Sequence, residues 1–492
     1  MKITKDLYQG SLALLTDFYQ LTMAYAYWKS GKAEQEAVFN LFFRKHPFQS
    51  GFTIAAGLEY VVDFCNNFYF KDDDLSYLGQ MKNADGSPVF ESAFLAYLKS
   101  LNFTCDIDAV EEGTVVFPHT PLISVKGPLI QCQLLETALL NIINFQTLIA
   151  TKSARVVLAA KGDSVLEFGL RRAQGIDGAL AASRASYIGG CAATSNVMAG
   201  KLFGIPVSGT HAHSWIMSFD SEIEAFKAYA DAFPEKCVFL VDTYDTVAGI
   251  KNAIEVGKIL RENGKEMLGV RIDSGDLAYF SNIAREMLDE AGFPEAKVVA
   301  SNDLDEHIIT SLKIQEASVS VWGVGTKLVT AYDQPALGAV YKLAAIKNER
   351  GVWEPKVKVS QQSIKINIPG EHQVSRFLKN GRAVADMIFL QEHKEDKTST
   401  TIIDPIDPTK RKRINFEDFE EISLLKPIFK KGEQIYDCPK IESIKLNAQE
   451  NLQHFDKTHK RLTNPHVYPV GLEENLYQLR TDLVFKMKNY DK

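Results

Sequence analysis

Three short polar segments of this 492-residue chain contain side chains suited to chemistry, and each directly follows an apolar run. Residues 209–214 read Gly-Thr-His-Ala-His-Ser, residues 271–276 read Arg-Ile-Asp-Ser-Gly-Asp, and residues 323–327 read Gly-Val-Gly-Thr-Lys. Histidine acts as a nucleophile or a base, an Arg/Asp pair binds charged groups, and successive backbone N–H groups of a glycine-rich turn can hold a phosphate. Together the three segments predict one phosphate-handling active site.

His211 and His213 flank Ala212 in the first segment. Two histidines at this spacing can be metal ligands, but no third histidine or cysteine in a matching motif supports such a site, and we predict no bound metal ligand set. The other functional option is a nucleophile or a general base. A hydrogen-bonded structural histidine is the commoner case, and it is less favoured here because this segment follows a strand, as the other two do.

Arg271 and Asp273 stand two residues apart at the end of an apolar strand, so their side chains point to the same face. Arg271 and Asp273 form either an ordinary ion pair or part of a ligand-binding site. Phe168 ends another predicted strand and is followed by Arg171 and Arg172. Arginine suits forked binding of carboxylate or phosphate, and the ring can stack on a flat ligand. A core phenylalanine followed by two surface arginines would give the same pattern.

Gly323 and Gly325 allow the backbone to approach a ligand closely, just before Thr326 and Lys327. The same glycines would also suit a tight turn from a strand into a helix. The chain contains no Walker A sequence (G-x-x-x-x-G-K-S/T), which excludes a P-loop nucleotide fold.

Strand and helix patterns alternate between about residues 150 and 345. The predicted strands are residues 164–168, 205–208, 238–241, 267–272, 297–300 and 318–322, with helical patterns at 246–262, 277–291 and 303–315. This repetition implies a parallel sheet, because parallel strands need crossover connections. The polar segments follow strands, which predicts a site at the carboxyl ends of the strands of a barrel or an open α/β sheet.

Four ranges differ in character along the chain. We expect an N-terminal α/β domain at residues 1–145, an α/β catalytic domain at 146–348, a β-rich return to the N-terminal domain at 349–430 and a mostly helical C-terminal segment at 431–492. Alternating residues at 354–360 and 364–370 predict antiparallel strands in the third range.

Composition favours a cytoplasmic enzyme that acts on small molecules. The net charge of −7 disfavours nucleic acid as a partner and still permits small phosphorylated ligands. Six cysteines are scattered without a C-x-x-C pair, which is typical of reduced cytosolic thiols. Residues 1–6 lack the apolar core of a signal peptide. The apolar stretch 129–150 contains Gln, Glu and Asn, so we expect a buried helix and no membrane span.

Taken in order, these segments resemble the nicotinate phosphoribosyltransferase family. The matching pieces are residues 16–23, 112–128, 168–175, 209–214, 241–246, 271–277, 301–303, 323–326 and 335–342. They extend from the N-terminus to about residue 380. The resemblance implies a type II phosphoribosyltransferase: an irregular parallel α/β barrel with an N-terminal α/β sandwich domain, assembled as a homodimer with shared active sites.

The resemblance also implies a reaction. Nicotinate would react with phosphoribosyl diphosphate to give nicotinate mononucleotide and diphosphate, with Mg²⁺ bound and with ATP hydrolysis coupled through a phosphorylated histidine. On the matching segment this phosphohistidine is His213, and Asp273 is a carboxylate suited to the ribose. The expected nicotinate contacts are Tyr19 of the partner subunit, Phe168, Thr210 and Arg271. The expected phosphoribosyl diphosphate contacts are Arg171, Asp245, Gly323, Gly325 and Thr326.

Three alternatives remain open at this point. The nicotinamide-using relative carries a carboxylate where this chain has Asn196, and a neutral side chain there favours nicotinate. Quinolinate phosphoribosyltransferase is shorter and needs more cationic groups for a dicarboxylate. A catalytically silent barrel that senses phosphorylated metabolites would not need a histidine placed for phosphoryl transfer.

Overall fold

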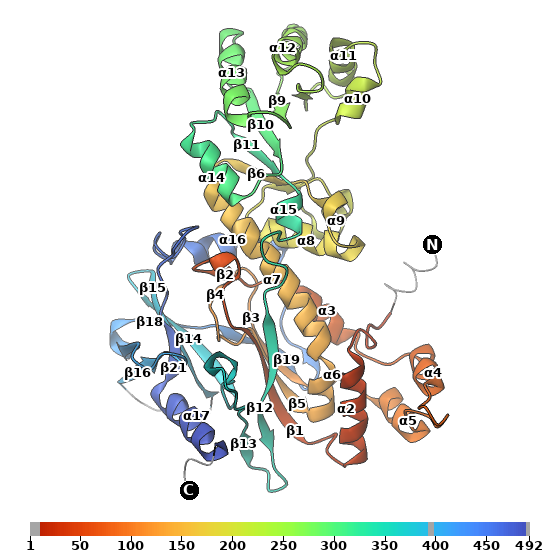
Figure 1. Cartoon of the computed structure of the whole chain (residues 1–492), viewed down its shortest axis with the longest axis vertical. Coiled ribbons are helices and arrows are strands. Elements are labelled where there is room, and N and C mark those ends of the chain that lie inside the picture. The colour runs from red at the N-terminus through yellow and green to blue at the C-terminus, as the bar shows by residue number, and fades with distance from the viewer. Residues whose placement is uncertain (1–9, 392–397, 489–492) are drawn as a thin grey trace. The chain divides into compact units, whose positions relative to one another are not determined.

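The computed structural model describes residues 10–391 and 398–488 (Figure 1). The expectation about a signal peptide concerns residues 1–6, which lie outside the described residues. The chain divides into two compact units. Unit 1 contains Met1–Thr147, Leu337–Lys440 and Gln449–Lys492, and unit 2 contains Leu148–Ala336 and Ile441–Ala448. The four domain ranges expected from the sequence stay a prediction.

Unit 2 is built on a six-stranded parallel sheet with the strand order β7-β6-β11-β10-β9-β8. Its strands are β6 (Ser164–Glu167), β7 (Ala193–Thr194), β8 (Val238–Leu240), β9 (Gly269–Ile272), β10 (Lys297–Asn302) and β11 (Val321–Val324). The parallel α/β architecture expected from the sequence is therefore confirmed. The short strand β7 has no counterpart among the predicted strands.

The predicted strand at residues 205–208 is wrong, because only an isolated parallel bridge joins Val207 to Thr194 of β7. Thr194 N donates to Pro206 O, and Ser208 N donates to Thr194 O, both at 3.0 Å. Pro206 has no N–H with which to extend this ladder. The segment follows helix α9 (Val197–Phe203) and makes the sheet irregular beyond β7.

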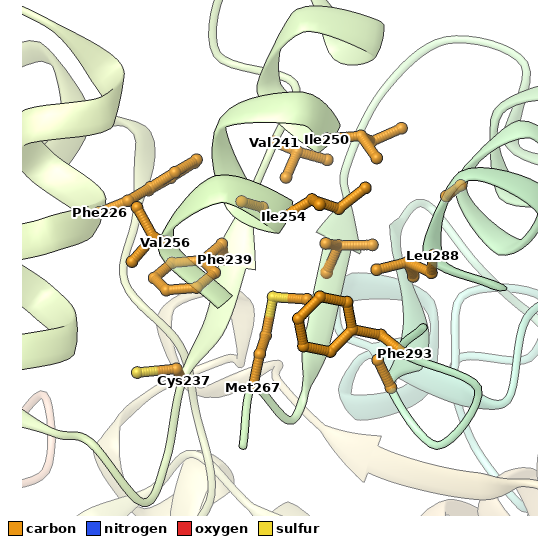
Figure 2. Close-up of a cluster of buried hydrophobic side chains, with 14 of the residues drawn as sticks. Phe226, Cys237, Phe239, Val241, Ile250, Ile254, Val256, Met267, Leu288 and Phe293 are labelled. Atoms are coloured by element: carbon orange, nitrogen blue, oxygen red, sulfur yellow. The ribbon is translucent and has the colours of Figure 1, made fainter. Parts of the chain in front are cut away.

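Four helices of unit 2 each have one apolar face. They are α11 (Glu222–Ala232), α12 (Thr246–Glu262), α13 (Leu277–Glu290) and α14 (Glu306–Ile314), and α12 spans the range predicted for it. Figure 2 shows the buried cluster that α11, α12 and α13 form with β8 and β9, including Phe226, Phe239, Val241, Ile250 and Ile254. This core fixes the ends of β8 and β9, from which polar side chains of the site emerge.

Unit 1 contains a seven-stranded antiparallel sheet with the order β13-β12-β1-β5-β3-β19-β20. Its strands are β1 (Glu36–Phe43), β3 (Asp106–Val110), β5 (Ile123–Pro128), β12 (Ala339–Lys347), β13 (Trp353–Pro355), β19 (Leu425–Lys430) and β20 (Glu433–Gln434). The late strands β12 and β19 pair with the early strands β1 and β3 (Figure 1).

A second sheet of unit 1 has six strands in the order β17-β16-β21-β15-β14-β18, and only β15 and β21 pair in parallel. These strands are β14 (His372–Lys379), β15 (Arg382–Leu390), β16 (Ser399–Ile403), β17 (Arg411–Asn415), β18 (Glu420–Ser423) and β21 (Val470–Glu473). The small pair β2 (Thr53–Ile54) and β4 (Val115–Val116) completes the sheets of unit 1 among the described residues.

The strand predicted at residues 364–370 is wrong, because the structure has the turn η3 (Ser363–Lys365) followed by irregular chain. Asn367 explains this conformation. Its side chain accepts from Lys358 N at 2.6 Å and donates to Leu343 O and Lys356 O at 3.1 Å each. The side chain thus occupies backbone groups that a paired strand would use.

The remaining long helices of the described residues are α2 (Phe18–Lys29), α3 (Leu58–Asn66), α4 (Asp72–Gln80), α5 (Ser92–Ser100), α6 (Leu129–Leu134), α7 (Glu136–Ala159), α8 (Ile176–Ile188), α16 (Ile441–Gln453) and α17 (Glu474–Met487). The apolar stretch 129–150 forms α6 and the first part of α7, which confirms that it is helical. No described helix combines the length and the apolar composition needed to cross a membrane.

Candidate active site

Arg271 is the centre of a hydrogen-bonded cluster at the carboxyl end of β9. It donates from Nε to Ser301 Oγ at 2.8 Å, from Nη1 to Thr210 Oγ1 at 2.9 Å and from Nη2 to Asp273 Oδ1 at 2.7 Å. The structure therefore brings two of the predicted polar segments together. A guanidinium group has five N–H donors, so these three bonds leave two for a ligand.

Asp273 is held in its ionised form by this cluster. Burial alone would raise its pKa, but the hydrogen bond from Ser301 and the charge of Arg271 outweigh burial, and the pKa is lowered. The other carboxylate oxygen, Oδ2, lies 3.9 Å from His213 Nε2. Ser301 was not predicted as a site residue, although it follows the predicted strand 297–300 and begins the matching piece 301–303.

The two histidines of residues 209–214 occupy different environments. His213 begins the short helix α10 (His213–Met217), its side chain is 39% exposed, and its Nδ1 lies 3.1 Å from Thr243 Oγ1. His211 is only 7% exposed, and burial lowers its pKa to about 4. An extended segment would point both rings to the same side, but the turn into α10 separates them. Only His213 is accessible to a ligand.

Asp242 supports the loop that follows β9. Its Oδ2 accepts hydrogen bonds from Asp273 N at 2.9 Å and from Ser274 Oγ at 2.6 Å. Its Oδ1 is buried and has no hydrogen-bond partner among the described residues. Asp242 and Thr243 were missed as site residues, although they stand in a segment that resembles the family.

Phe168 follows β6, and the centre of its ring lies 5.8 Å from the guanidinium carbon of Arg271. Gly323 makes room for the ring, because a Cβ at position 323 would lie 2.7 Å from Phe168 Cδ2. A Cβ at Gly325 would lie 3.2 Å from Phe168 O. Both glycines therefore have a packing role, in addition to the anion-binding role predicted for them.

Arg171 and Arg172 lie in the turn η2 (Leu170–Arg172), just after Phe168, and both are exposed. Within the described part of the chain, neither guanidinium group has a hydrogen bond or an ion pair. Their positive charges are thus free for an anionic ligand.

Thr326 and Lys327 begin the short helix α15 (Thr326–Val329) after the glycine-rich turn. Lys327 Nζ lies 2.7 Å from Asp305 Oδ2, and this hydrogen bond raises the pKa of Lys327. Asp305 also caps α14, because its Oδ1 accepts from His307 N and Ile308 N. Lys327 is therefore committed to Asp305, whereas the Thr326 hydroxyl has no partner among residues 10–391 and 398–488.

Two aspartates of the polar segments cap helices. Asp245 Oδ1 accepts from Ala248 N at 2.8 Å at the start of α12, and Asp276 Oδ1 accepts from Tyr279 N at 3.0 Å at the start of α13. The structural role considered for Asp276 is confirmed. The phosphoribosyl diphosphate contact expected of Asp245 stays a prediction.

Asn196 belongs to a buried polar network and is 1% exposed. Its Oδ1 accepts from Ala199 N at 3.2 Å, which caps α9, and its Nδ2 donates to Ser183 Oγ at 3.1 Å. Ser183 and Thr194 in turn donate to Glu167 Oε2 at 2.8 and 2.5 Å. Both ends of the Asn196 amide are used within the protein, so a structural role accounts for it.

Tyr19 lies in unit 1, on α2, and is 50% exposed. Its expected contact with the nicotinate ring stays a prediction. Across the described residues, no group of three His, Cys, Asp or Glu side chains is arranged to hold a metal ion by itself.

Three family models match this chain. The model of the nicotinate phosphoribosyltransferase N-terminal domain matches residues 14–144, that of the nicotinate phosphoribosyltransferase family matches residues 164–384, and that of the C-terminal domain matches residues 371–480. Together they cover most of the sequence.

Relatives match over nearly the whole length. A nicotinate phosphoribosyltransferase of Bacillus subtilis is 45% identical over 483 residues, which are 97% of this chain and 96% of the relative. One of Caenorhabditis elegans is 41% identical over 527 residues, covering 94% of this chain and 92% of the relative. The crystal structure of human nicotinic acid phosphoribosyltransferase aligns with a TM-score of 0.83 at 32% identity, covering 95% of this chain and 99% of that one. This structural match confirms the predicted fold class.

Proposed function

The chain belongs to the nicotinate phosphoribosyltransferase family, and from this premise we propose that it transfers the phosphoribosyl group of phosphoribosyl diphosphate to nicotinate, coupled to ATP hydrolysis, in NAD salvage. The products are nicotinate mononucleotide and diphosphate. The observation that supports this reaction best is the cluster of Arg271, Asp273 and His213, which combines an anion donor, a carboxylate and an accessible imidazole.

Nicotinate binding rests on Arg271 and Phe168. The two N–H groups of Arg271 that the protein leaves free match the two oxygens of the nicotinate carboxylate. The Thr210 hydroxyl donates to His211 O at 3.1 Å while it accepts from Arg271, so Thr210 acts by orienting the guanidinium group. The Phe168 ring beside Arg271 offers a face on which the pyridine ring stacks.

The transfer step separates charge, because positive charge develops on the anomeric carbon of the ribose as diphosphate leaves. Asp273 is ionised, part-exposed and fixed by Arg271, so it can stabilise that charge without reorganising. Arg171 and the Thr326 hydroxyl, both without partners in the described chain, are suited to the diphosphate and phosphate oxygens.

Mg²⁺ fits this arrangement as an ion held largely by the diphosphate and water, which is the usual mode for this cation. The buried Asp242 Oδ1, which lacks a hydrogen-bond partner in the described residues, is the protein oxygen best suited to it. The bound ion would neutralise charge on the leaving group.

Energy coupling rests on His213. With the ring neutral and its proton on Nδ1, the imidazole donates to Thr243 Oγ1 and keeps a lone pair on Nε2. That nitrogen attacks the terminal phosphorus of ATP, so an N–P bond forms as the bond to ADP breaks. His211 is buried and cannot take this role without opening the loop.

The decisive experiment measures product formation from labelled nicotinate and labelled nicotinamide, each with phosphoribosyl diphosphate and Mg²⁺, with and without ATP. We expect product from nicotinate, stimulation by ATP and little product from nicotinamide. Equal use of both bases would favour the nicotinamide-using alternative. Binding of phosphoribosyl diphosphate without any product would favour a sensor.

A further inference from the structure

β8 is an edge strand of the parallel sheet in unit 2, and among the described residues its only neighbour in that sheet is β9. Consecutive N–H groups of a strand point to opposite sides, and Val241 N donates to Arg271 O of β9 at 3.0 Å. Leu240 N therefore points to the other side, away from β9. Its hydrogen bond goes to a side chain: His211 Nε2 accepts it at 3.3 Å.

His211 ends the irregular segment that pairs with β7 through Val207. The segment thus has a main-chain bond to β7 at one end and the His211 imidazole against β8 at the other. Nε2 can accept only in a neutral ring with its proton on Nδ1. Burial keeps the pKa of His211 near 4, with smaller effects from the Ala212 backbone, Arg271 and His213, so this form persists at neutral pH.

Aromatic packing fixes the ring of His211 in this position. Its centroid lies 4.8 Å from that of Tyr229, 5.9 Å from that of Phe226 and 6.4 Å from that of Phe239. Phe226 and Phe239 belong to the core cluster shown in Figure 2. The anchor is therefore a buried side chain in a packed environment, in contrast to the exposed ring of His213.

We propose that His211 is a positioning residue for the phosphoryl-transfer loop: by accepting the Leu240 N–H it fastens residues 205–213 to β8 and so sets Thr210 and His213 in the site. Thr210 precedes His211 and bonds Arg271, whereas His213 follows two residues later and contacts Thr243. The hydrogen bond from Leu240 N to His211 lies between these two contacts along the chain. The activity arm of the test rests on the proposed function.

Three variants of His211 separate this role from mere packing. Gln places its Oε1 near the position of Nε2 and can accept the Leu240 N–H, whereas Asn is too short to reach it, and Phe fills the space without an acceptor. We expect His211→Gln to keep ATP-stimulated turnover within about threefold, and His211→Asn and His211→Phe to lose on the order of 10- to 100-fold in kcat with little change in KM for phosphoribosyl diphosphate. The control is His307→Phe, at an exposed position of unit 2, which should change nothing.

Hydrogen exchange at the amide of Leu240 tests its hydrogen bond to His211 independently of catalytic activity. Protection should be retained in His211→Gln and lost in His211→Asn and His211→Phe. Loss of protection in the Gln variant, or equal turnover of the Gln and Asn variants, would overturn the proposal. If wild type forms no nicotinate mononucleotide, the proposed function fails, yet the exchange result still decides whether His211 anchors the loop. If His211→Phe does not fold, the comparison of His211→Gln with His211→Asn still decides whether His211 anchors the loop.

Discussion

Asp273 Oδ2 lies 3.9 Å from His213 Nε2, the ring nitrogen that Thr243 does not contact. The other oxygen of the same carboxylate is bound by Arg271. One carboxylate therefore faces both the site proposed for the base and the site proposed for phosphoryl transfer. This sharing offers a structural route by which the two reactions can be coupled.

Replacing His213 should separate ATP hydrolysis from phosphoribosyl transfer. With terminally labelled ATP, wild type should acquire acid-labile, base-stable label on the peptide that contains residues 209–215, and His213→Ala should acquire none. Slow transfer without ATP should survive, because Arg271 and Phe168 remain in place. The matched control is His307→Ala. Label that persists in His213→Ala and disappears in a His211 variant would reassign the phosphoryl acceptor.

Replacing Asp273 should lower kcat and change the stability of the protein at acid pH. Asp273→Asn removes a charge that the transition state uses, so we expect kcat to fall on the order of 100-fold. The folded-state pKa of Asp273 lies below its ordinary value of 3.8, so its ionisation stabilises the fold above that pH. This contribution is lost as pH falls through the lowered pKa.

Urea unfolding of wild type and Asp273→Asn at several pH values measures this effect. The difference in the free energy of unfolding should stay constant from pH 7 to about 5 and narrow as pH falls through 3.8 and then through the lowered pKa. A difference that already narrows between pH 7 and 5 would mean that the cluster does not keep Asp273 ionised in the way described.

A methyl group at Gly323 should displace Phe168. The new Cβ would lie 2.7 Å from the ring, so Gly323→Ala should shift the ring and raise KM for nicotinate roughly tenfold. Gly178→Ala is the matched control, since no atom lies within 4 Å of a Cβ there and alanine suits its helix α8. An unchanged KM in Gly323→Ala would show that Phe168 does not contact nicotinate.

Asn196→Asp should destabilise the protein and leave its choice of base intact. The substitution removes the donor to Ser183 and adds a carboxylate to the network that already contains Glu167. We expect a loss of about 2 kcal/mol or more, seen as a Tm lower by roughly 5 °C or more, with Asn263→Asp on the surface as control. A stable variant that loses only nicotinate turnover would instead make Asn196 a reader of the base.

Tyr19→Ala should raise KM for nicotinate if Tyr19 stacks on the base in a second subunit. Aromatic stacking contributes about 0.5–1.5 kcal/mol, which corresponds to roughly two- to tenfold in KM. Tyr77, which is 59% exposed in unit 1, provides the control variant Tyr77→Ala. A monomer that stays fully active after dilution would contradict an active site shared between two subunits.

The sequence predicted five of the six strands of the parallel sheet, all except β7, and the side chains that follow them, because strand–helix repetition and polar strand ends are local patterns. It placed Arg271 and Asp273 on one face, and the structure joins them. The residue pattern alone did not separate His211 from His213, since the turn into α10 depends on tertiary contacts, and only the family resemblance pointed to His213. Ser301 and Asp242 escaped notice because each acts through a partner distant in the sequence. The strand at 205–208 failed because Pro206 interrupts pairing that the apolar pattern suggests.

The pairing of β1 with β12 and of β3 with β19 has a consequence for synthesis on the ribosome. The N-terminal strands β1 and β3 can pair with β5 early, but β1 lacks its second neighbour until translation has passed Lys347, the last residue of β12, and β3 lacks its second neighbour until Lys430, the last residue of β19. All six strands of the parallel sheet lie between Ser164 and Val324, so they are complete earlier. Until each late strand is made, the nascent chain exposes one open edge of β1 or of β3, and an open strand edge is where pairing with another chain would begin.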